Sequence, residues 1–244
     1  MERLIYTAVS GAELAQTALR VTANNLANVN TPGFKADMEQ AQSMMVAGDG
    51  FRTRYQAQML PVATDLAAGA MMETGRDLDL VVSDGGFITV IDANGEEAYT
   101  RAGNLNISAD GQLQVNGLAV AGAQGPLVLP PFGAIDISAD GTINILPVGG
   151  GVIAQAGQIK LVSAEGQPML KGLDGLLRPQ DGEALAADAA ISVRSGALEG
   201  SNVNAIEQMV ATMNISRQFE INIKMMKAAD ELAASGNKLV GNAG

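Results

Sequence analysis

The chain contains no cysteine, histidine or tryptophan among its 244 residues. Without cysteine, no disulfide framework stabilises the fold. Thiolate and imidazole are the usual protein ligands of zinc, copper and haem iron, and imidazole is the base in Ser/His/Asp and Cys/His catalysis. We therefore expect no cofactor, no metal site and no histidine-dependent enzyme, whereas carboxylate, lysine or N-terminal catalysis stays open.

Aromatic residues are also scarce, at 3% of the chain, while hydrophobic residues reach 47% and glycine numbers 29. This apolar content excludes wholesale disorder and predicts a core built from small aliphatic side chains. The length fits one domain or two.

Positive charge is scarce as well, because 15 basic residues face 26 acidic ones and the net charge is -11. A nucleic-acid-binding protein normally carries a basic surface, so we expect no nucleic-acid partner. Most of the acidic excess lies between residues 36 and 202. This distribution predicts near-neutral ends that pack against protein and an acidic centre that faces water, although chance placement of charges remains an alternative.

Long hydrophobic runs are missing too. No apolar stretch reaches the 18 or so residues of a membrane span, and Ser10, Gly11 and Glu13 interrupt the N-terminal segment. We expect a soluble protein with no direct membrane insertion and no cleaved signal peptide. This expectation does not cover export routes that use uncleaved N-termini.

Two long segments have helical periodicity. Residues 3–28 carry a narrow, alanine-rich stripe, and Thr31-Pro32-Gly33 is expected to end this helix. Residues 203–235 carry a broader stripe, with Ser201 or Asn202 as N-cap and Gly236 at the end. Each stripe fits an intramolecular core and an intermolecular contact equally well. The stripe residues are Ile5, Ala8, Ala12, Ala15, Leu19, Thr22 and Leu26 in the first helix, and Ile206, Met209, Val210, Met213, Phe219, Ile223 and Met226 in the second.

The residues between the helices have the pattern of short strands and tight turns. Asn94-Gly95 and Asn116-Gly117 predict two hairpins, and Ser-Ala-Asp-Gly at 108–111 and 138–141 predicts one repeated turn geometry. The expected strands are 86–91, 113–115, 135–137, 142–146, 158–163 and 190–194.

Possible ligand sites in this region are weak. The Asp-Gly turns lack the further oxygen ligands of a calcium loop, and the glycine runs do not follow the pattern of a phosphate loop. Asp77, Asp79 and Asp84 form the one tight acidic cluster, which we interpret as a solvated strand edge. An enzyme that uses carboxylates and a secreted β-rich binding module are the alternatives to a structural protein.

Three sequence motifs stand out along the chain. The first is the run 23–35, with Ala-Asn-Asn-Leu-Ala-Asn-Val-Asn-Thr-Pro-Gly-Phe-Lys. The second is 196–204, Gly-Ala-Leu-Glu-Gly-Ser-Asn-Val-Asn, with further stretches at 207–210 and 217–220, and the third spans 99–104 and 110–113. These motifs resemble the flagellar rod and hook axial protein family, and the resemblance covers about half the chain. Within the family the chain most resembles the proximal-rod members, and the distal-rod members are the alternative.

The resemblance implies an α+β fold in which N- and C-terminal helices pair into a coiled-coil layer around a central all-β domain of small hairpins. The expected divisions are 1–35 and 195–244 for the helices, 36–76 for an extended connector and 77–194 for the β-domain. The resemblance also implies a structural subunit of the periplasmic basal-body rod. Its expected partners are further copies of itself, other rod subunits and the flagellar export apparatus.

The resemblance further implies that the matching residues carry assembly. Asn24, Asn25, Asn28 and Asn30 fit two interpretations, since they either cap and bridge the backbone or contact another subunit. The candidate assembly residues are Asn24, Asn25, Leu26, Ala27, Asn28, Thr31, Pro32, Gly33, Phe34, Ser201, Asn202, Val203 and Asn204.

Overall fold

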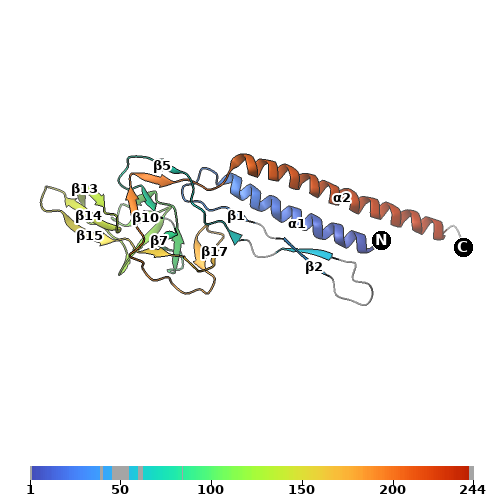
Figure 1. Cartoon of the computed structure of the whole chain (residues 1–244), viewed down its shortest axis with the longest axis horizontal. Coiled ribbons are helices and arrows are strands. Elements are labelled where there is room, and N and C mark those ends of the chain that lie inside the picture. The colour runs from blue at the N-terminus through green and yellow to red at the C-terminus, as the bar shows by residue number, and fades with distance from the viewer. Residues whose placement is uncertain (1, 39–40, 46–54, 60–62, 84, 242–244) are drawn as a thin grey trace. The chain divides into compact units, whose positions relative to one another are not determined.

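The computed structural model describes residues 2–38, 41–45, 55–59, 63–83 and 85–241. It has an α+β fold, in which helix α1 (Glu2–Ala27) and helix α2 (Ala205–Gly241) stand at the two ends of a β-rich sequence (Figure 1). The chain forms two compact units. The first unit comprises residues 1–27, 37–63 and 204–244, and the second comprises 28–36 and 64–203.

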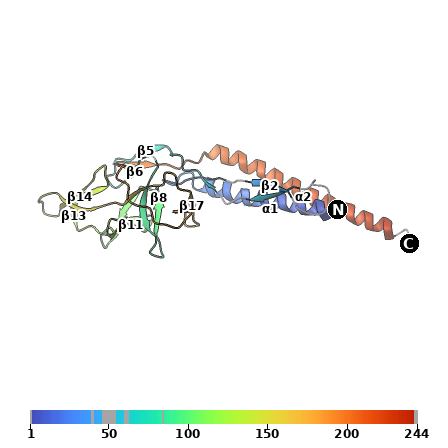
Figure 2. The same cartoon turned by 60° about the horizontal axis from the view of Figure 1, so that its bottom comes forward.

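Within the first unit, α1 packs along α2, and both views show the helices side by side (Figures 1 and 2). The face of α1 toward α2 is made of small residues, because Ala8, Ala12 and Ala15 are all buried. Gly11 lies so close to α2 that an added Cβ would stand 3.0 Å from the side-chain nitrogen of Asn222. Small side chains thus permit a close helix contact that buries little area.

The ends of the helices differ from the sequence prediction. Asn204, and not Ser201 or Asn202, caps α2, because its Oδ1 accepts the Ile206 amide at 3.0 Å. Gly236 does not end α2, which continues to Gly241; one glycine costs a helix only about 1 kcal/mol. In the part of the chain that the structure describes, neither helix is long and apolar enough to cross a membrane.

The segment 36–76 contains short strands in its described parts. They are β1 (Asp37–Met38), β2 (Ala41–Met45), β3 (Tyr55–Met59), β4 (Ala63–Thr64) and β5 (Met71–Glu73). Strands β2 and β3 pair antiparallel, with Ala41 opposite Met59. The backbone here is therefore extended and partly paired.

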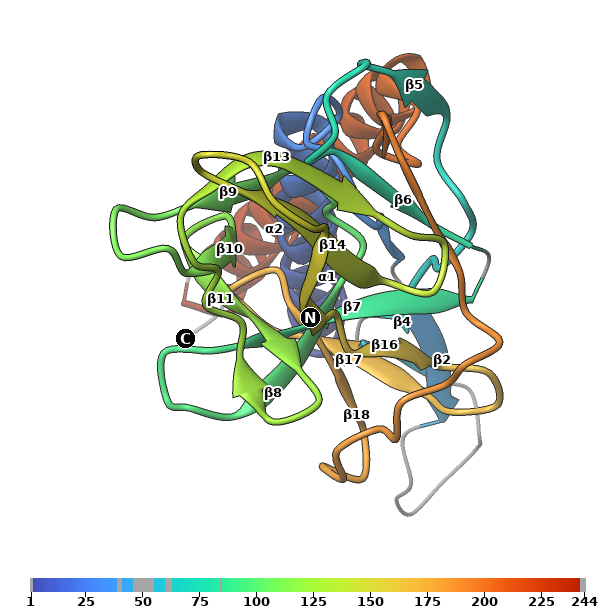
Figure 3. The ribbon, with the colours of Figure 1, turned by 90° about the vertical axis from the view of Figure 1, so that its left-hand side faces the viewer.

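The second unit is built on a nine-stranded sheet (Figure 3). Its main path runs β17-β18-β8-β7-β11-β10-β9, with β12 on β11 and β16 on β7. The bounds are β7 (Gly86–Ile91), β8 (Glu97–Thr100), β9 (Leu105–Ile107), β10 (Leu113–Val115), β11 (Leu118–Gly122), β12 (Gly125–Pro126), β16 (Leu161–Ser163), β17 (Met169–Lys171) and β18 (Leu177–Pro179).

Smaller sheets complete the second unit. A three-stranded sheet has the order β13-β14-β15, and two further pairs are β19 with β6 and β20 with β5. The predicted strand 158–163 is wrong as a single element, because β15 ends at Gln158 and β16 begins at Leu161 in a different sheet. The bounds are β6 (Leu80–Val82), β13 (Phe132–Ile137), β14 (Thr142–Pro147), β15 (Ala154–Gln158), β19 (Val193–Ser195) and β20 (Ala197–Glu199).

Strand β7 is buried on both faces, and its side chains alternate between two hydrophobic clusters. Ile88 and Val90 belong to the larger cluster, which also takes in Ile143 and Ile145 of β14. Phe87 belongs to a smaller cluster with six other residues, which are Tyr99, Val162, Ala164, Met169, Leu177 and Leu185. The period of two along a strand thus supplies both clusters from one element.

The two Ser-Ala-Asp-Gly sequences adopt the same turn, which confirms the prediction. In each, the glycine amide donates to the serine carbonyl, at 3.0 Å for Gly111 and 2.9 Å for Gly141. Both glycines have φ of 80°, a left-handed conformation that favours glycine.

Candidate functional site

Each of the three family-like motifs contributes one charged residue to a buried cluster in the second unit. Lys35 comes from the first motif, Arg101 from the third and Glu199 from the second. Lys35 Nζ lies 2.6 Å from Glu199 Oε1, and Arg101 Nε lies 2.8 Å from Glu199 Oε2. All three side chains are at most 3% exposed, so the pairs are shielded from water.

Both cations are further satisfied by backbone carbonyls. Lys35 Nζ donates to the Ala67 carbonyl at 2.6 Å, and Arg101 Nη1 donates to the carbonyls of Ser83 and Gly86. Glu199 Oε1 also accepts the Gly69 amide at 2.9 Å. A buried ion pair is tolerated only when its remaining donors and acceptors are satisfied in this way.

Asn202 extends this cluster along the chain. Its Oδ1 accepts the Ala36 amide at 2.8 Å, while its Nδ2 donates to the carbonyls of Asp65 at 2.9 Å and Ala67 at 3.2 Å. We refer to Lys35, Arg101, Glu199 and Asn202 as the clasp. The clasp joins three segments that are far apart in sequence, namely 33–36, 65–69 and 199–202.

The backbone around Gly33 fits closely beneath the clasp. The Gly33 amide donates to the Glu199 carbonyl at 2.8 Å. Its φ is +69°, and an added Cβ would stand 2.2 Å from the Ala102 backbone nitrogen. The next residue, Phe34, makes a cation–π contact, with Lys171 Nζ 3.7 Å from the centroid of its ring. Glycine is therefore required at position 33 for two separate reasons, backbone conformation and space.

The clasp shifts the ionisation of its members. Burial lowers the pKa of Lys35 below 10.5, because desolvation outweighs the stabilisation by Glu199. Burial alone would raise the pKa of Glu199, but its bonds from Lys35 and the Gly69 amide and the nearby Arg101 bring the net pKa below 4.5. Glu199 is therefore a stable carboxylate at neutral pH.

A hollow of about 360 Å³ lies beside Arg101 and Glu199. Its apolar wall includes Val81, Val82 and Val193. These two buried charges are already paired with each other, and Glu199 is also paired with Lys35. The arrangement therefore performs a structural role, since it bonds the loop segments 33–36 and 65–69 to Glu199 and Asn202.

The asparagines of the first motif do not act as one group. Asn25 is 2% exposed and makes two hydrogen bonds to the backbone of Asp37. Its Nδ2 donates to the Asp37 carbonyl at 2.8 Å, and its Oδ1 accepts the Asp37 amide at 2.9 Å. In the second unit, Thr31 Oγ1 donates to Asn28 Oδ1 at 3.1 Å. Asn24 and Asn30 are exposed. Bridging of the backbone is thus present at Asn25.

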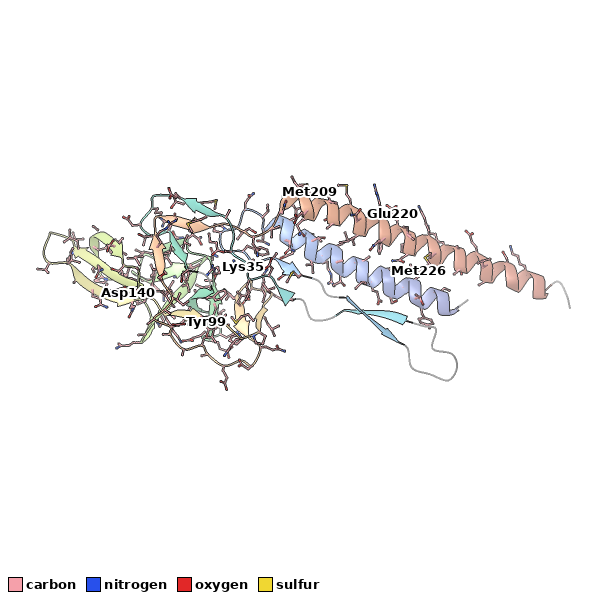
Figure 4. The ribbon with its side chains drawn as sticks, viewed as in Figure 1. Lys35, Tyr99, Asp140, Met209, Glu220 and Met226 are labelled. Carbon is pink, nitrogen blue, oxygen red and sulfur yellow. The ribbon has the colours of Figure 1, made fainter. Side chains whose placement is uncertain are left out.

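Helix α2 leaves much of its apolar stripe uncovered within the chain. Ile206, Val210 and Met213 are 74%, 48% and 57% exposed. Met209 points away from α1, whereas Met226 lies on the side toward it (Figure 4). Of the other stripe residues, Phe219, Ile223, Ile5, Leu19 and Leu26 are partly buried.

The remaining candidate residues are spread over the two units. Val203 is 9% exposed, Ser201 Oγ accepts the Val203 amide at 3.2 Å, and Pro32 is partly buried. Ala27 and Asn204 are exposed.

The acidic cluster around residue 79 also differs from the prediction. Asp79 is only 5% exposed, so the interpretation as a solvated edge is wrong for this residue. Its carboxylate stays buried because Arg76 Nη1 donates to it at 3.2 Å. Asp77 is exposed, and Asp84 lies outside the described residues.

Sequence reasoning missed three of the four clasp members as site residues, selecting only Asn202. A signal was present, since the first and third motifs contain the cations Lys35 and Arg101 and the second contains the anion Glu199. The sequence could not show that these charges meet, because 164 positions separate Lys35 from Glu199.

Three family models match the chain. They are the flagella basal body rod protein model over residues 5–35, the flagellar hook protein FlgE/F/G D1 domain over 81–145, and the flagellar basal body rod FlgEFG protein C-terminal over 194–239. Each contains one of the charged clasp residues, Lys35, Arg101 or Glu199. These matches define the class of protein: flagellar axial proteins of the rod and hook.

Full-length relatives narrow the class. The chain is 37% identical to the flagellar basal-body rod protein FlgF of Salmonella typhimurium, over 98% of this chain and 99% of the relative. FlgF of Escherichia coli gives the same identity and coverage, whereas FlgG of Agrobacterium fabrum is 28% identical over 97% and 98%. The chain belongs to the flagellar basal-body rod protein family. It is a structural component of the flagellar basal body and not an enzyme.

Proposed function

We propose that this chain is a proximal-rod subunit of the FlgF type, which assembles with further copies and with other rod subunits into the tubular drive shaft of the flagellum. The higher identity to FlgF than to FlgG supports the proximal assignment, and FlgG-type distal rod is the alternative. The terminal helices act as the assembling part, and α1 and α2 pair as a coiled coil.

The observation that carries this proposal is the exposed apolar face of α2. Ile206, Met209 and Met213 are each more than half exposed, although such side chains normally lie inside a protein. A second subunit that covers this face would bury it from water, at about 25 cal/mol per Å² of apolar surface. Because the same face is repeated on every copy, heterologous contacts through it extend into a helical assembly.

Placing a charge on this face tests the proposal. Met213→Glu should abolish incorporation into the rod and motility, because the carboxylate would be buried without a partner in the assembled state. The isolated chain should keep its helix content, since Met213 is exposed there. Complementation of a deletion strain, scored by swimming and by the protein content of purified basal bodies, measures the effect.

Gln218→Glu is the matched control, because residue 218 is exposed on the same helix and receives the same new charge. It should support normal swimming. If Met213→Glu restores motility as well as the unaltered chain does, the exposed face is not an assembly surface.

We propose further that the asparagines of the first motif contact a neighbouring subunit where they are exposed. Asn24 and Asn30 face outward, whereas Asn25 bonds within its own unit. Asn24→Ala and Asn30→Ala, made separately, should reduce rod assembly. Intact assembly and swimming in both would leave capping and turn formation as their role.

The rod location implies residence in the periplasm and passage through the flagellar export apparatus without a cleaved signal. The intact N-terminal helix supports this, because Ala8, Ala12 and Ala15 pack against α2 and their removal would expose it. N-terminal sequencing of the protein from basal bodies should therefore find the residues from Ala8 to Ala15 retained.

A further inference from the structure

We infer that the clasp is a latch within the second unit, which opens and closes while the β-sheets stay folded. In the closed state Glu199 and Asn202 hold the segments 33–36 and 65–69 against 199–202. In the open state these segments separate, and the nine-stranded sheet keeps its structure.

The first support is the distribution of apolar burial. The two hydrophobic clusters draw their buried members from residues 80–193. None of their members comes from 28–36, 64–70 or 196–203, all of which the structure describes. The sheets therefore have a core of their own, and the clasp segments are attached to them mainly by polar contacts.

The second support is the way these contacts depend on one short segment. The Gly33 amide, the Gly69 amide and Lys35 Nζ all bond to Glu199. The Gly200 amide donates to the Ala70 carbonyl at 2.7 Å, and the Ala36 amide bonds to Asn202. Segments that share their partners in this manner detach together, as one cooperative opening unit.

The third support is electrostatic. Among the residues that the structure describes, Glu199 is the one anion that contacts both Lys35 and Arg101, and removing a member of a buried ion pair leaves an uncompensated charge. Without the carboxylate, Lys35 is left as a buried charge with no anionic partner, whereas Arg101 keeps its bonds to the carbonyls of Ser83 and Gly86. Opening the latch is the least costly way to hydrate Lys35, because the sheet core is not disturbed.

The latch has a consequence for the chain boundaries. The chain passes between the two units at four points, 27/28, 36/37, 63/64 and 203/204. The clasp holds the second-unit side of the last three of these crossings, through Ala36, Asp65 and Asn202. Its state therefore decides whether these crossings are held together.

Hydrogen exchange of the full chain, followed by mass spectrometry, tests the inference. In Glu199→Gln, amides of 33–36 and 67–70 should exchange about a hundredfold faster or more, as expected for loss of a buried pair. Amides of β7 and β8 should keep their wild-type rates. Glu97→Gln is the matched control, because it removes a carboxylate paired with Lys160 at 2.7 Å and should leave the clasp amides unchanged.

Two results would overturn the inference. Equal acceleration in β7, β8 and the clasp segments would mean that the clasp unfolds only with the whole unit. Unchanged rates at 33–36 and 67–70 would mean that Glu199 does not hold them. If Glu199→Gln is not obtained folded, Lys35→Met provides the same readout, with faster exchange expected at 33–36 and not in β7.

Discussion

The buried carboxylate of Glu199, which is paired with Lys35 and Arg101, makes the stability of the second unit depend on pH. Glu199 has a folded-state pKa below its ordinary value of 4.5, so the folded protein resists protonation at this site more than the unfolded chain does. Its contribution to stability is fully present above pH 4.5. It is lost as the pH falls through the lowered pKa.

The prediction is that the urea midpoint of the second unit falls as the pH is lowered from about 6 to about 3, and that Glu199→Gln weakens this dependence. Some dependence should remain in the variant, because Arg178 lowers the pKa of Asp92 and Asp174 in the same manner. Near-ultraviolet circular dichroism of buried Tyr99 follows unfolding. Identical pH profiles for the two proteins would show that Glu199 is not held as an anion.

Asn25 provides a second prediction at the residue scale. Asn25→Ala removes the two hydrogen bonds from a buried side chain to the Asp37 backbone, which should cost about 2 kcal/mol of unfolding free energy in the first unit. Thermal unfolding followed by far-ultraviolet circular dichroism measures the loss. Asn30→Ala, at an exposed position of the same motif, should change stability by less than about 0.5 kcal/mol. A loss as large in Asn30→Ala would contradict this account.

At the scale of elements, the contact of α1 with α2 depends on small side chains. Gly11→Leu would push a branched side chain into Asn222 and separate the helices, because even a Cβ meets that side chain at 3.0 Å. We expect a loss of helix content and a lower melting temperature. Gln16→Leu, which introduces the same residue at an exposed position of α1, is the control. Equal melting of the two variants would show that Gly11 is not at a close contact.

The helices and turns were largely predictable from the sequence, whereas the clasp was not. Periodicity predicted both helices to within a few residues, except at the end of α2, and Asn-Gly and Asp-Gly predicted the turns, because these signals are local. Local signals could not identify Asn204 as the cap, since Asn202 was an equally good cap residue and is used in the clasp instead. The meeting of Lys35, Arg101 and Glu199 depends on contacts between distant segments, which no single stretch of sequence encodes.

At the scale of the whole molecule, α2 is a helix whose apolar residues its own chain covers only in part. It has 37 residues against 26 in α1, so α1 cannot cover its full length (Figure 2). Isolated helices are only marginally stable in water, and tertiary packing supplies most of their stability. We therefore predict that far-ultraviolet helicity rises with protein concentration as copies associate. The control is Met213→Glu, whose helicity should not depend on concentration; equal behaviour of both proteins would contradict assembly through this face.

The central claim is that this chain is a building part of the basal-body rod. Antibody labelling of basal bodies purified from the native bacterium, with a strain lacking the gene as control, tests it most directly. The account predicts that label is found on the rod and that the deletion strain yields no completed rod. Basal bodies that are complete in the deletion strain and carry no label in the wild type would contradict the claim.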